Sequence, residues 1–115
     1  MTRDPETVAP DAPVTEVAEL MRDTGMGMIA VTEGERLRGV VTDRDIVIRA
    51  VAAGKDLDLC AVGDIASAQL TTVAPDDDVA TVAQRMRDAD VRRVPVVDDT
   101  RVVGVISVRD LDGQG

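Results

Sequence analysis

The sequence has 115 residues but contains no His, Phe, Trp or Tyr, and it has a single cysteine. Without histidine, it lacks the side chain that proteins use most often as a general acid or base and as a metal ligand. Without aromatic rings, it offers no platform on which nucleic-acid bases stack. Cys60 alone forms neither an internal disulfide nor a zinc cluster, and we interpret it as a small, half-buried apolar residue. These absences argue against an enzyme and against a metal site.

The balance of charge excludes further classes of protein. The formal net charge is −9, the wrong sign for binding a phosphate backbone, so we expect no nucleic-acid partner. No stretch approaches the ~20 consecutive apolar residues that span a bilayer. Residues 1–6 also lack the apolar core of a signal peptide. The sequence therefore predicts a cytoplasmic protein with no membrane partner, folded as a single module over residues 1–115.

What the chain does contain is a tandem duplication. Residues 7–45 align with residues 72–110 at a constant offset of 65, without a gap, and 17 of the 39 aligned positions are identical. The first repeat covers about residues 2–54, a polar linker follows over 55–61, and the second repeat covers about 62–111. A duplication of this kind predicts two similar halves related by a pseudo-two-fold axis.

Hydrophobic periodicity assigns the elements of each repeat. In repeat one it predicts a helix over 13–24 capped by Asp11 or its neighbour, a hairpin of strands over 28–32 and 37–41, and a helix after residue 42 that ends at Gly54. The apolar face of that last helix is expected to include Ile46, Val47, Ala50 and Val51. Repeat two predicts a helix over 78–89 and strands over 94–97 and 102–106, preceded by a short helical turn at 62–65. The pattern is β-α-β-β-α in each half, an α/β (α+β) fold.

One motif ends both hairpins. It reads Gly-apolar-apolar-Thr/Ser-x-x-Asp, once at 39–45 and again at 104–110. Thr42 and Ser107 stand where a helix N-cap belongs, and Asp45 and Asp110 stand three residues later, the arrangement of a capping box. The same strand-to-helix junction is suited to receiving an anion. The residues alone leave both uses open.

Two copies of this pattern at one spacing resemble the cystathionine β-synthase (CBS) domain pair, also called the Bateman module. The resemblance extends over about residues 2–111, and the proline-containing strand at 94–98 also fits it. The chain is similar to small stand-alone bacterial CBS pairs, and residues 37–55 are similar to the hypoxia-response type among them.

The resemblance implies a regulatory module that senses a small molecule and requires no cofactor. It implies that an adenosine-containing ligand, of the AMP, ADP, ATP or S-adenosylmethionine class, binds in two clefts between the repeats. The aspartates, Asp45 and Asp110, would take the ribose hydroxyls, and Thr42 and Ser107 would lie near the phosphates. Apolar strand residues would flank the base; in this sequence they are Met28, Ile29, Val94 and Pro95.

Arg92 and Arg93 are the expected phosphate-binding pair, because the family commonly places a basic residue just before this strand. We expect them to serve the cleft that contains Asp45. The matching positions in repeat one carry no charge, which predicts that the Asp110 cleft is the poorer phosphate site. An ordinary solvated basic pair at a helix-to-strand turn is the alternative interpretation. Asp43 and Asp45 form an Asp-x-Asp pair, but residues two apart on a helix do not face one another, so we expect no metal site there.

The alternative function is a ligand-free module for oligomerisation or protein interaction. It predicts empty clefts and a homodimer that buries helix faces around Val17, Met21, Val82 and Met86. The aliphatic helix faces make a homodimer the expected state under either function.

Overall fold

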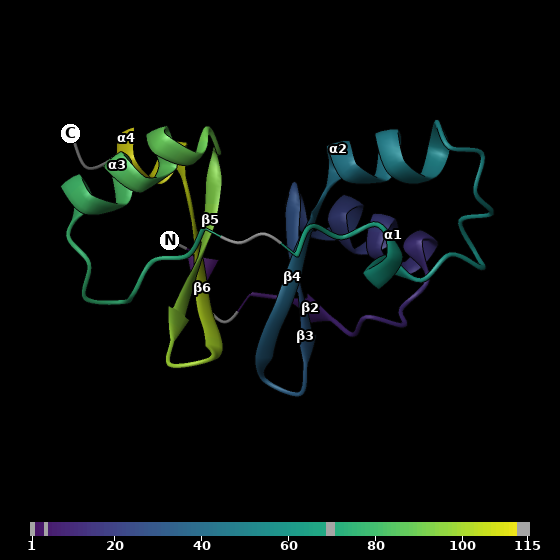
Figure 1. Ribbon diagram of the computed structural model, residues 1–115, viewed down its shortest axis with the longest axis horizontal. Coiled ribbons are helices and arrows are strands. Elements are labelled where there is room, and N and C mark those ends of the chain that lie inside the picture. The colour runs from purple at the N-terminus through teal and green to yellow at the C-terminus, as the bar shows by residue number, and fades with distance from the viewer. Residues whose placement is uncertain (1, 4, 69–70, 113–115) are drawn as a thin grey trace. The chain divides into compact units, whose positions relative to one another are not determined.

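The computed structural model describes residues 2–3, 5–68 and 71–112, and its backbone forms two compact units (Figure 1). One unit comprises residues 6–70, and the other comprises residues 1–5 together with residues 71–115. Each unit contains one strand hairpin with helices before and after it, so the predicted α/β fold of two similar repeats is confirmed. Within the described ranges, no helix is long and apolar enough to cross a membrane.

The 6–70 unit is built on the hairpin β3–β4. Strand β2 runs parallel to β3, and β3 runs antiparallel to β4. In chain order the elements are β2 (Thr7–Val8), α1 (Val14–Thr24), β3 (Met28–Glu33), β4 (Arg36–Thr42), α2 (Asp43–Ile46), a π-helical turn (Val47–Val51) and a 3₁₀ turn (Val62–Asp64). The predicted strands and the short turn after the linker are therefore confirmed.

The other unit repeats this plan on the hairpin β5–β6. Its elements are β1 (Thr2–Arg3), α3 (Val79–Ala89), β5 (Arg93–Asp98), β6 (Arg101–Ser107) and α4 (Val108–Asp112). Val73 forms a parallel bridge with Val96, just as Val8 pairs in parallel with Val31 in the 6–70 unit. Both hairpins shift register at the same place, between Val31 and Thr32 and between Val96 and Val97. The duplication thus extends to an irregularity of the sheet.

Each hairpin has its helices on one side, with a hydrophobic core between (Figure 1). In the 6–70 unit, Val17 and Met21 of α1 pack in one cluster with Ile29, Val31 and Val41 of the hairpin. In the other unit, Val82 and Met86 of α3 pack with Val73, Val94 and Val96. The prediction that a dimer buries helix faces around Val17, Met21, Val82 and Met86 is therefore wrong. These side chains are at most 8% exposed because the apolar face of each helix covers its own hairpin.

Each unit also receives a strand from the segment that precedes the other repeat. Thr2 and Arg3, from the start of repeat one, pair antiparallel with Val105 and Gly104 of β6. Ser67, at the start of repeat two, bridges Val40 of β4 in the same antiparallel sense. The two pairings correspond at the offset of 65. The compact units therefore do not coincide with the sequence repeats at these lead-in segments.

The N-terminus of α1 is capped by the linker and not by Asp11, so that prediction is wrong. The N-cap residue is Pro13, which makes no side-chain cap. Instead, the backbone N–H groups of Val14 and Thr15 donate to the carbonyls of Cys60 and Leu57, at 3.0 and 3.1 Å. The equivalent helix α3 is capped by Asp78, whose carboxylate accepts the N–H of Thr81 at 2.8 Å. A cap supplied from 42 and 46 residues away leaves no local pattern in the sequence.

The helix after β4 does not keep one apolar face. Residues 43–46 are α-helical, but Val47–Val51 form a π-helical turn. A π-turn holds more residues than an α-turn, so positions spaced for a period of 3.6 rotate away from the core. Ile46 and Ala50 are buried as predicted, whereas Val47 and Val51 are 53% and 54% exposed, contrary to the prediction.

Two backbone positions take a left-handed conformation in both repeats. Gly25 ends α1 with a φ of +75°, and Asp90 ends α3 with a φ of +55°. Gly34 and Asp99 show the same correspondence in the hairpin turns, with φ of +64° and +61°. Glycine adopts this region without the steric cost that a Cβ introduces. Repeat two therefore carries strain that repeat one avoids.

Replacing Asp90 by Gly should raise the free energy of unfolding by about 0.5–1 kcal/mol. The substitution relieves the left-handed strain and removes a negative charge from the negative end of the helix dipole. The reciprocal change, Gly25→Asp, should lower the free energy of unfolding by a similar amount. Urea denaturation at pH 7 measures both. A variant Asp90→Gly no more stable than the original protein would contradict this interpretation.

Candidate functional site

The motif at the end of β4 forms the predicted capping box. The carboxylate of Asp45 accepts the backbone N–H of Thr42 at 2.9 Å, and the hydroxyl of Thr42 accepts the backbone N–H of Asp45 at 3.1 Å. Both side chains are partly buried, and that of Asp45 is 18% exposed. The box holds the Asp45 carboxylate in a fixed place at the junction of strand and helix.

The same box closes the second hairpin. The Asp110 carboxylate accepts the Ser107 N–H at 2.9 Å, and the Ser107 hydroxyl accepts the Asp110 N–H at 3.3 Å. The N–H of Ser107 holds the pKa of Asp110 below its ordinary value, since a donor stabilises the ionised carboxylate. Asp110 is therefore charged at neutral pH and acts as an acceptor for hydroxyl and amide donors.

The backbone donors at the start of α2 are all engaged within the protein. Thr42 and Asp45 donate within the box, and the N–H of Asp43 donates to the carbonyl of Gly27 at 3.1 Å. The N–H of Arg44 donates to the Asp43 carboxylate at 2.8 Å. The predicted cap is therefore formed in this structure. An anion that used these donors would have to displace contacts within the protein, so side-chain cations are the groups more available to it.

One such cation, Arg49, was not predicted from the sequence. Its Nε lies 3.8 Å from the Asp45 carboxylate, and its Nη1 donates to the carbonyl of Ile65 at 3.3 Å. The side chain is 53% exposed. The signal was available, because Arg49 stands four residues after Asp45, the spacing at which opposite charges meet on a helix.

Arg92 and Arg93 lie beside the motif of their own unit. Arg93 is paired with Ser107 across the β5–β6 hairpin, and the carbonyl of Arg92 accepts the N–H of Val108 at 2.9 Å. Both residues are exposed. Gly27 fills the place of Arg92 in the other unit, where its carbonyl accepts the N–H of Asp43. That Arg92 and Arg93 bind the phosphate of a ligand held by Asp45 stays a prediction.

The four residues expected to flank a base do not share one face of their strands. Ile29 and Val94 belong to the two hydrophobic clusters under the helices. Met28 and Pro95 are also buried, but alternation along β3 and β5 turns them to the opposite face. Met28 and Pro95 therefore point away from the two clusters, and the role of the four residues as a base pocket stays a prediction.

The glycine of the motif has a steric role. Val40 and Ser67 exchange backbone hydrogen bonds of 3.1 and 2.8 Å, which brings residues 66–68 close to β4. A Cβ on Gly39 would lie 2.7 Å from the carbonyl oxygen of Ser67, closer than such atoms approach. Gly39 thus permits the lead-in segment of repeat two to join the edge of β4.

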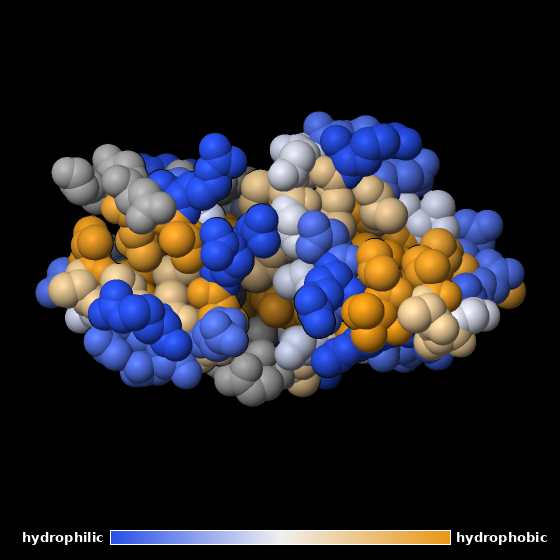
Figure 2. Space-filling model, turned by 90° about the horizontal axis from the view of Figure 1, so that it is seen from above, coloured by the Kyte–Doolittle hydropathy of each residue, from blue (hydrophilic) through white to orange (hydrophobic). Residues whose placement is uncertain are grey.

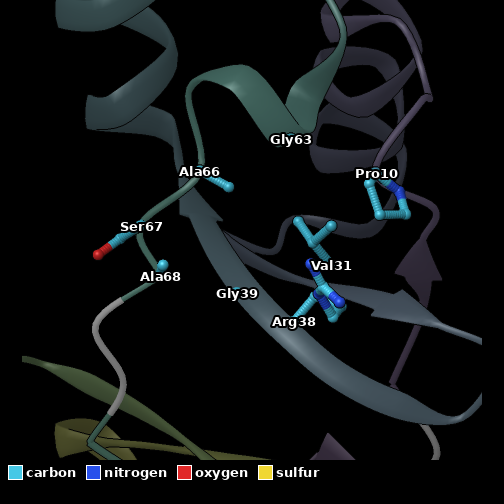
Figure 3. Close-up of a pocket in the computed structure, with 8 residues that line it drawn as sticks. All are labelled: Pro10, Val31, Arg38, Gly39, Gly63, Ala66, Ser67 and Ala68. Carbon is cyan, nitrogen blue, oxygen red and sulfur yellow. The ribbon is translucent and has the colours of Figure 1, made fainter.

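A small pocket lies beside this junction in the 6–70 unit (Figure 3). Its volume is about 150 Å³. Its lining comes from β3, β4, the 3₁₀ turn, the lead-in segment and the turn between β2 and α1, and consists of Pro10, Val31, Arg38, Gly39, Gly63, Ala66, Ser67 and Ala68. Pockets for drug-sized ligands measure roughly 300–1,000 Å³, so this one does not hold a whole nucleotide.

A second hollow of about 390 Å³ lies along α1, and half of its eight lining residues are acidic. Glu6, Glu16, Glu19 and Asp23 line it with Arg22, a charge that repels phosphates. Across the described part of the chain, no three His, Cys, Asp or Glu side chains gather closely enough to hold a metal ion.

Comparison with known proteins places this geometry in a family context. The model of the CBS domain matches residues 1–51 and again residues 62–112. The CBS domain-containing protein YhcV of Bacillus subtilis (strain 168) is 35% identical over 111 residues, which cover 96% of this chain and 79% of YhcV. The two matched segments cover both repeats.

The predicted similarity to hypoxia-response CBS pairs is confirmed. Hypoxic response protein 1 of Mycobacterium tuberculosis (strain ATCC 25618 / H37Rv) is 33% identical over 99 residues, covering 85% of this chain and 69% of that protein. A crystal structure of Hypoxic Response Protein I, described with two coordinated zinc ions, superposes with a TM-score of 0.92 at 30% identity and covers 100% of this chain and 94% of that one.

A third relative is described by its presumed role. The structure of a putative signal-transduction protein with CBS domains from Burkholderia ambifaria MC40-6 superposes with a TM-score of 0.89 at 28% identity. The match covers 97% of this chain and 82% of that one.

Proposed function

The chain belongs to the CBS-domain family as a tandem CBS pair, and from this premise we propose that it is a cytoplasmic regulatory module that binds an adenosine-containing ligand. The ligand contacts are the box residues at the ends of the two hairpins, Thr42 with Asp45 and Ser107 with Asp110. One observation carries the proposal: the same box holds an aspartate at the same place in both units.

The chemistry of the box suits a ribose. The N–H of Thr42 occupies one oxygen of the Asp45 carboxylate, and the other oxygen faces Arg49 at the longer distance of 3.8 Å. An ionised carboxylate has about four lone-pair positions, so it accepts ribose hydroxyls in addition to the box contact. Because the box fixes the carboxylate before the ligand arrives, binding does not have to order this side chain.

The module can act as a regulator if the ligand binds one conformation of the protein more tightly than another. A ligand shifts a conformational equilibrium by its difference in affinity for the two states. The lead-in segment over residues 66–68 is the part of the 6–70 unit that would report such a change, because Arg49 links the Asp45 carboxylate to the carbonyl of Ile65 just before it.

Isothermal titration calorimetry with AMP, ADP, ATP and S-adenosylmethionine tests the proposal. We expect at least one ligand to bind with a Kd below about 1 mM. The variant Asp45→Asn keeps an oxygen for the Thr42 N–H but loses the charge, and it should weaken binding at this site about tenfold or more. The matched control is Asp43→Asn in the same turn, which should not weaken binding, because it removes a negative charge that the proposal does not use to hold the ribose.

Two results would contradict this function. If none of the four ligands binds below about 1 mM, the proposed ligand class is wrong. If Asp45→Asn binds as well as the original protein while its thermal unfolding is unchanged, the assignment of Asp45 to the ribose is wrong.

A second candidate function, oligomerisation, is favoured by an exposed apolar surface on the π-helical turn. Val47, Ile48 and Val51 are each more than half exposed there, so three large apolar side chains of one short turn are left uncovered by the core. Figure 2 shows apolar residues gathered among charged ones over the part of the molecule that holds residues 6–70. We propose that a second copy of the chain covers Val47, Ile48 and Val51.

Sedimentation velocity tests the homodimer. The original protein should sediment as a dimer, and Ile48→Glu should shift it to a monomer, because a buried unpaired charge is costly. Leu59→Glu is the control: Leu59 is 83% exposed in the linker and lies outside the proposed surface. A monomeric original protein at micromolar concentration would rule out this dimer.

A further inference from the structure

The geometry around Asp45 also bears on which adenosine ligands the site selects. We propose that Arg49 is the residue that recognises the anionic group of the ligand, so that the Asp45 site prefers phosphorylated adenosine ligands to uncharged adenosine and to S-adenosylmethionine. This inference rests on the proposed function. In this proposal the positive charge near the ligand comes from Arg49 and not from the backbone of the motif. Arg49 adds to the expected contribution of Arg92 and Arg93.

The first step of the argument concerns the donors at the motif. The N–H groups of residues 42–45 are engaged with Asp45, Gly27, Asp43 and Thr42, in that order. A phosphate that used these donors would have to displace the partners they already have, which reduces what it gains from them. Its recognition in this unit therefore depends on a guanidinium or ammonium group close to the Asp45 carboxylate.

The second step concerns charge. Asp43 and Asp45 place two carboxylates within one turn, and a phosphate beside them meets repulsion. Arg49 is the guanidinium that contacts Asp45, with its Nε 3.8 Å from the carboxylate. It offsets the charge of Asp45 and leaves the carboxylate able to accept hydroxyls from a ribose. A ligand that joins a diol to an anion thus matches the pair better than a diol alone.

The third step concerns the availability of Arg49. Its two contacts, at 3.3 and 3.8 Å, are longer than the 2.7–2.9 Å typical of strong charge-assisted hydrogen bonds. Its side chain is 53% exposed, and a guanidinium has five N–H donors. Arg49 can therefore engage an anion while it remains beside Asp45, or exchange its contact with Ile65 for one with a phosphate.

The second box provides an internal contrast. In the sequence, the residue four after Asp110 is Gln114, which lies outside the described residues, and it carries no charge. The Asp110 site has no arginine at the position of Arg49. The Asp110 site thus lacks a counterpart of Arg49, and the exposed cations beside its motif are Arg92 and Arg93.

Calorimetry with AMP, adenosine and S-adenosylmethionine tests the inference, in an Asp110→Asn background so that the Asp45 site is the one observed. With Arg49 present, AMP should bind at least tenfold more tightly than adenosine. Arg49→Gln should lower the AMP affinity about tenfold and change the adenosine affinity by less than about threefold, and Arg49→Lys should restore part of the loss. The control Arg22→Gln, on α1, removes an exposed guanidinium paired with Asp23 and should change neither affinity.

Each other outcome overturns the inference in a distinguishable way. An equal loss of AMP and adenosine binding in Arg49→Gln would show that Arg49 only positions Asp45. No change in either affinity would assign the anion to other cations, with Arg92 and Arg93 the next to test. Equal binding of AMP and adenosine by the background protein would remove the selectivity but leave the proposed function standing. Absence of binding by all three ligands, in the background protein and in the original protein alike, would remove this inference, and the proposed function would fall with it only if ADP and ATP also failed to bind.

Discussion

The antiparallel pairing of Ser67 with Val40 is the contact that shapes the surroundings of the Thr42–Asp45 box in the 6–70 unit. It adds residues from the start of the second sequence repeat to the edge of β4, next to the strand that ends in the Thr42–Asp45 box. Thr2 and Arg3 make the corresponding pairing with β6. The pairing explains the glycine of the motif, because a side chain at position 39 would collide with the Ser67 carbonyl. It also brings Ile65 within reach of Arg49 and creates the small pocket beside Gly39. A glycine that sequence analysis associates with a binding motif is thus first a requirement of strand pairing.

Local patterns in the sequence were sufficient for much of this architecture. Capping and strand alternation depend on residues within four positions of each other, so each hairpin and each box is predictable from its own stretch of sequence. The offset of 65 shows that the same patterns occur in both repeats. Contacts between distant residues were not predictable in the same way. The linker carbonyls that cap α1 come from residues 57 and 60, and no local signal near Pro13 announces them. The π-turn after Ile46 changes the period on which the apolar face was assigned, and so Val47 and Val51 were misplaced. Helix faces taken for a dimer surface proved to be core, since a single amphipathic face cannot serve both.

The candidate site shows the same division between what is local and what is not. Thr42, Asp45, Ser107 and Asp110 lie in the boxes where the motif predicts them. The sequence did not reveal that the box and its neighbours engage the backbone donors of α2, which favours a side-chain cation as the partner of an anionic ligand. The sequence-based base pocket also grouped residues that point to opposite faces of their strands. Alternation along β3 and β5 distinguishes Ile29 and Val94 from Met28 and Pro95. Arg49 was visible in the sequence at helical spacing, but its contact with Ile65 depends on the lead-in pairing.

The pairing between the lead-in segment and β4 is open to direct measurement by amide hydrogen exchange, followed by NMR on the original protein. The N–H groups of Val40 and Ser67 donate to each other's carbonyls, at 3.1 and 2.8 Å. If this contact is part of the folded unit, both amide protons should exchange as slowly as those of the β3–β4 hairpin, through opening of the whole unit. Exchange of Ser67 and Val40 as fast as that of the exposed turn at residues 52–54 would contradict the account.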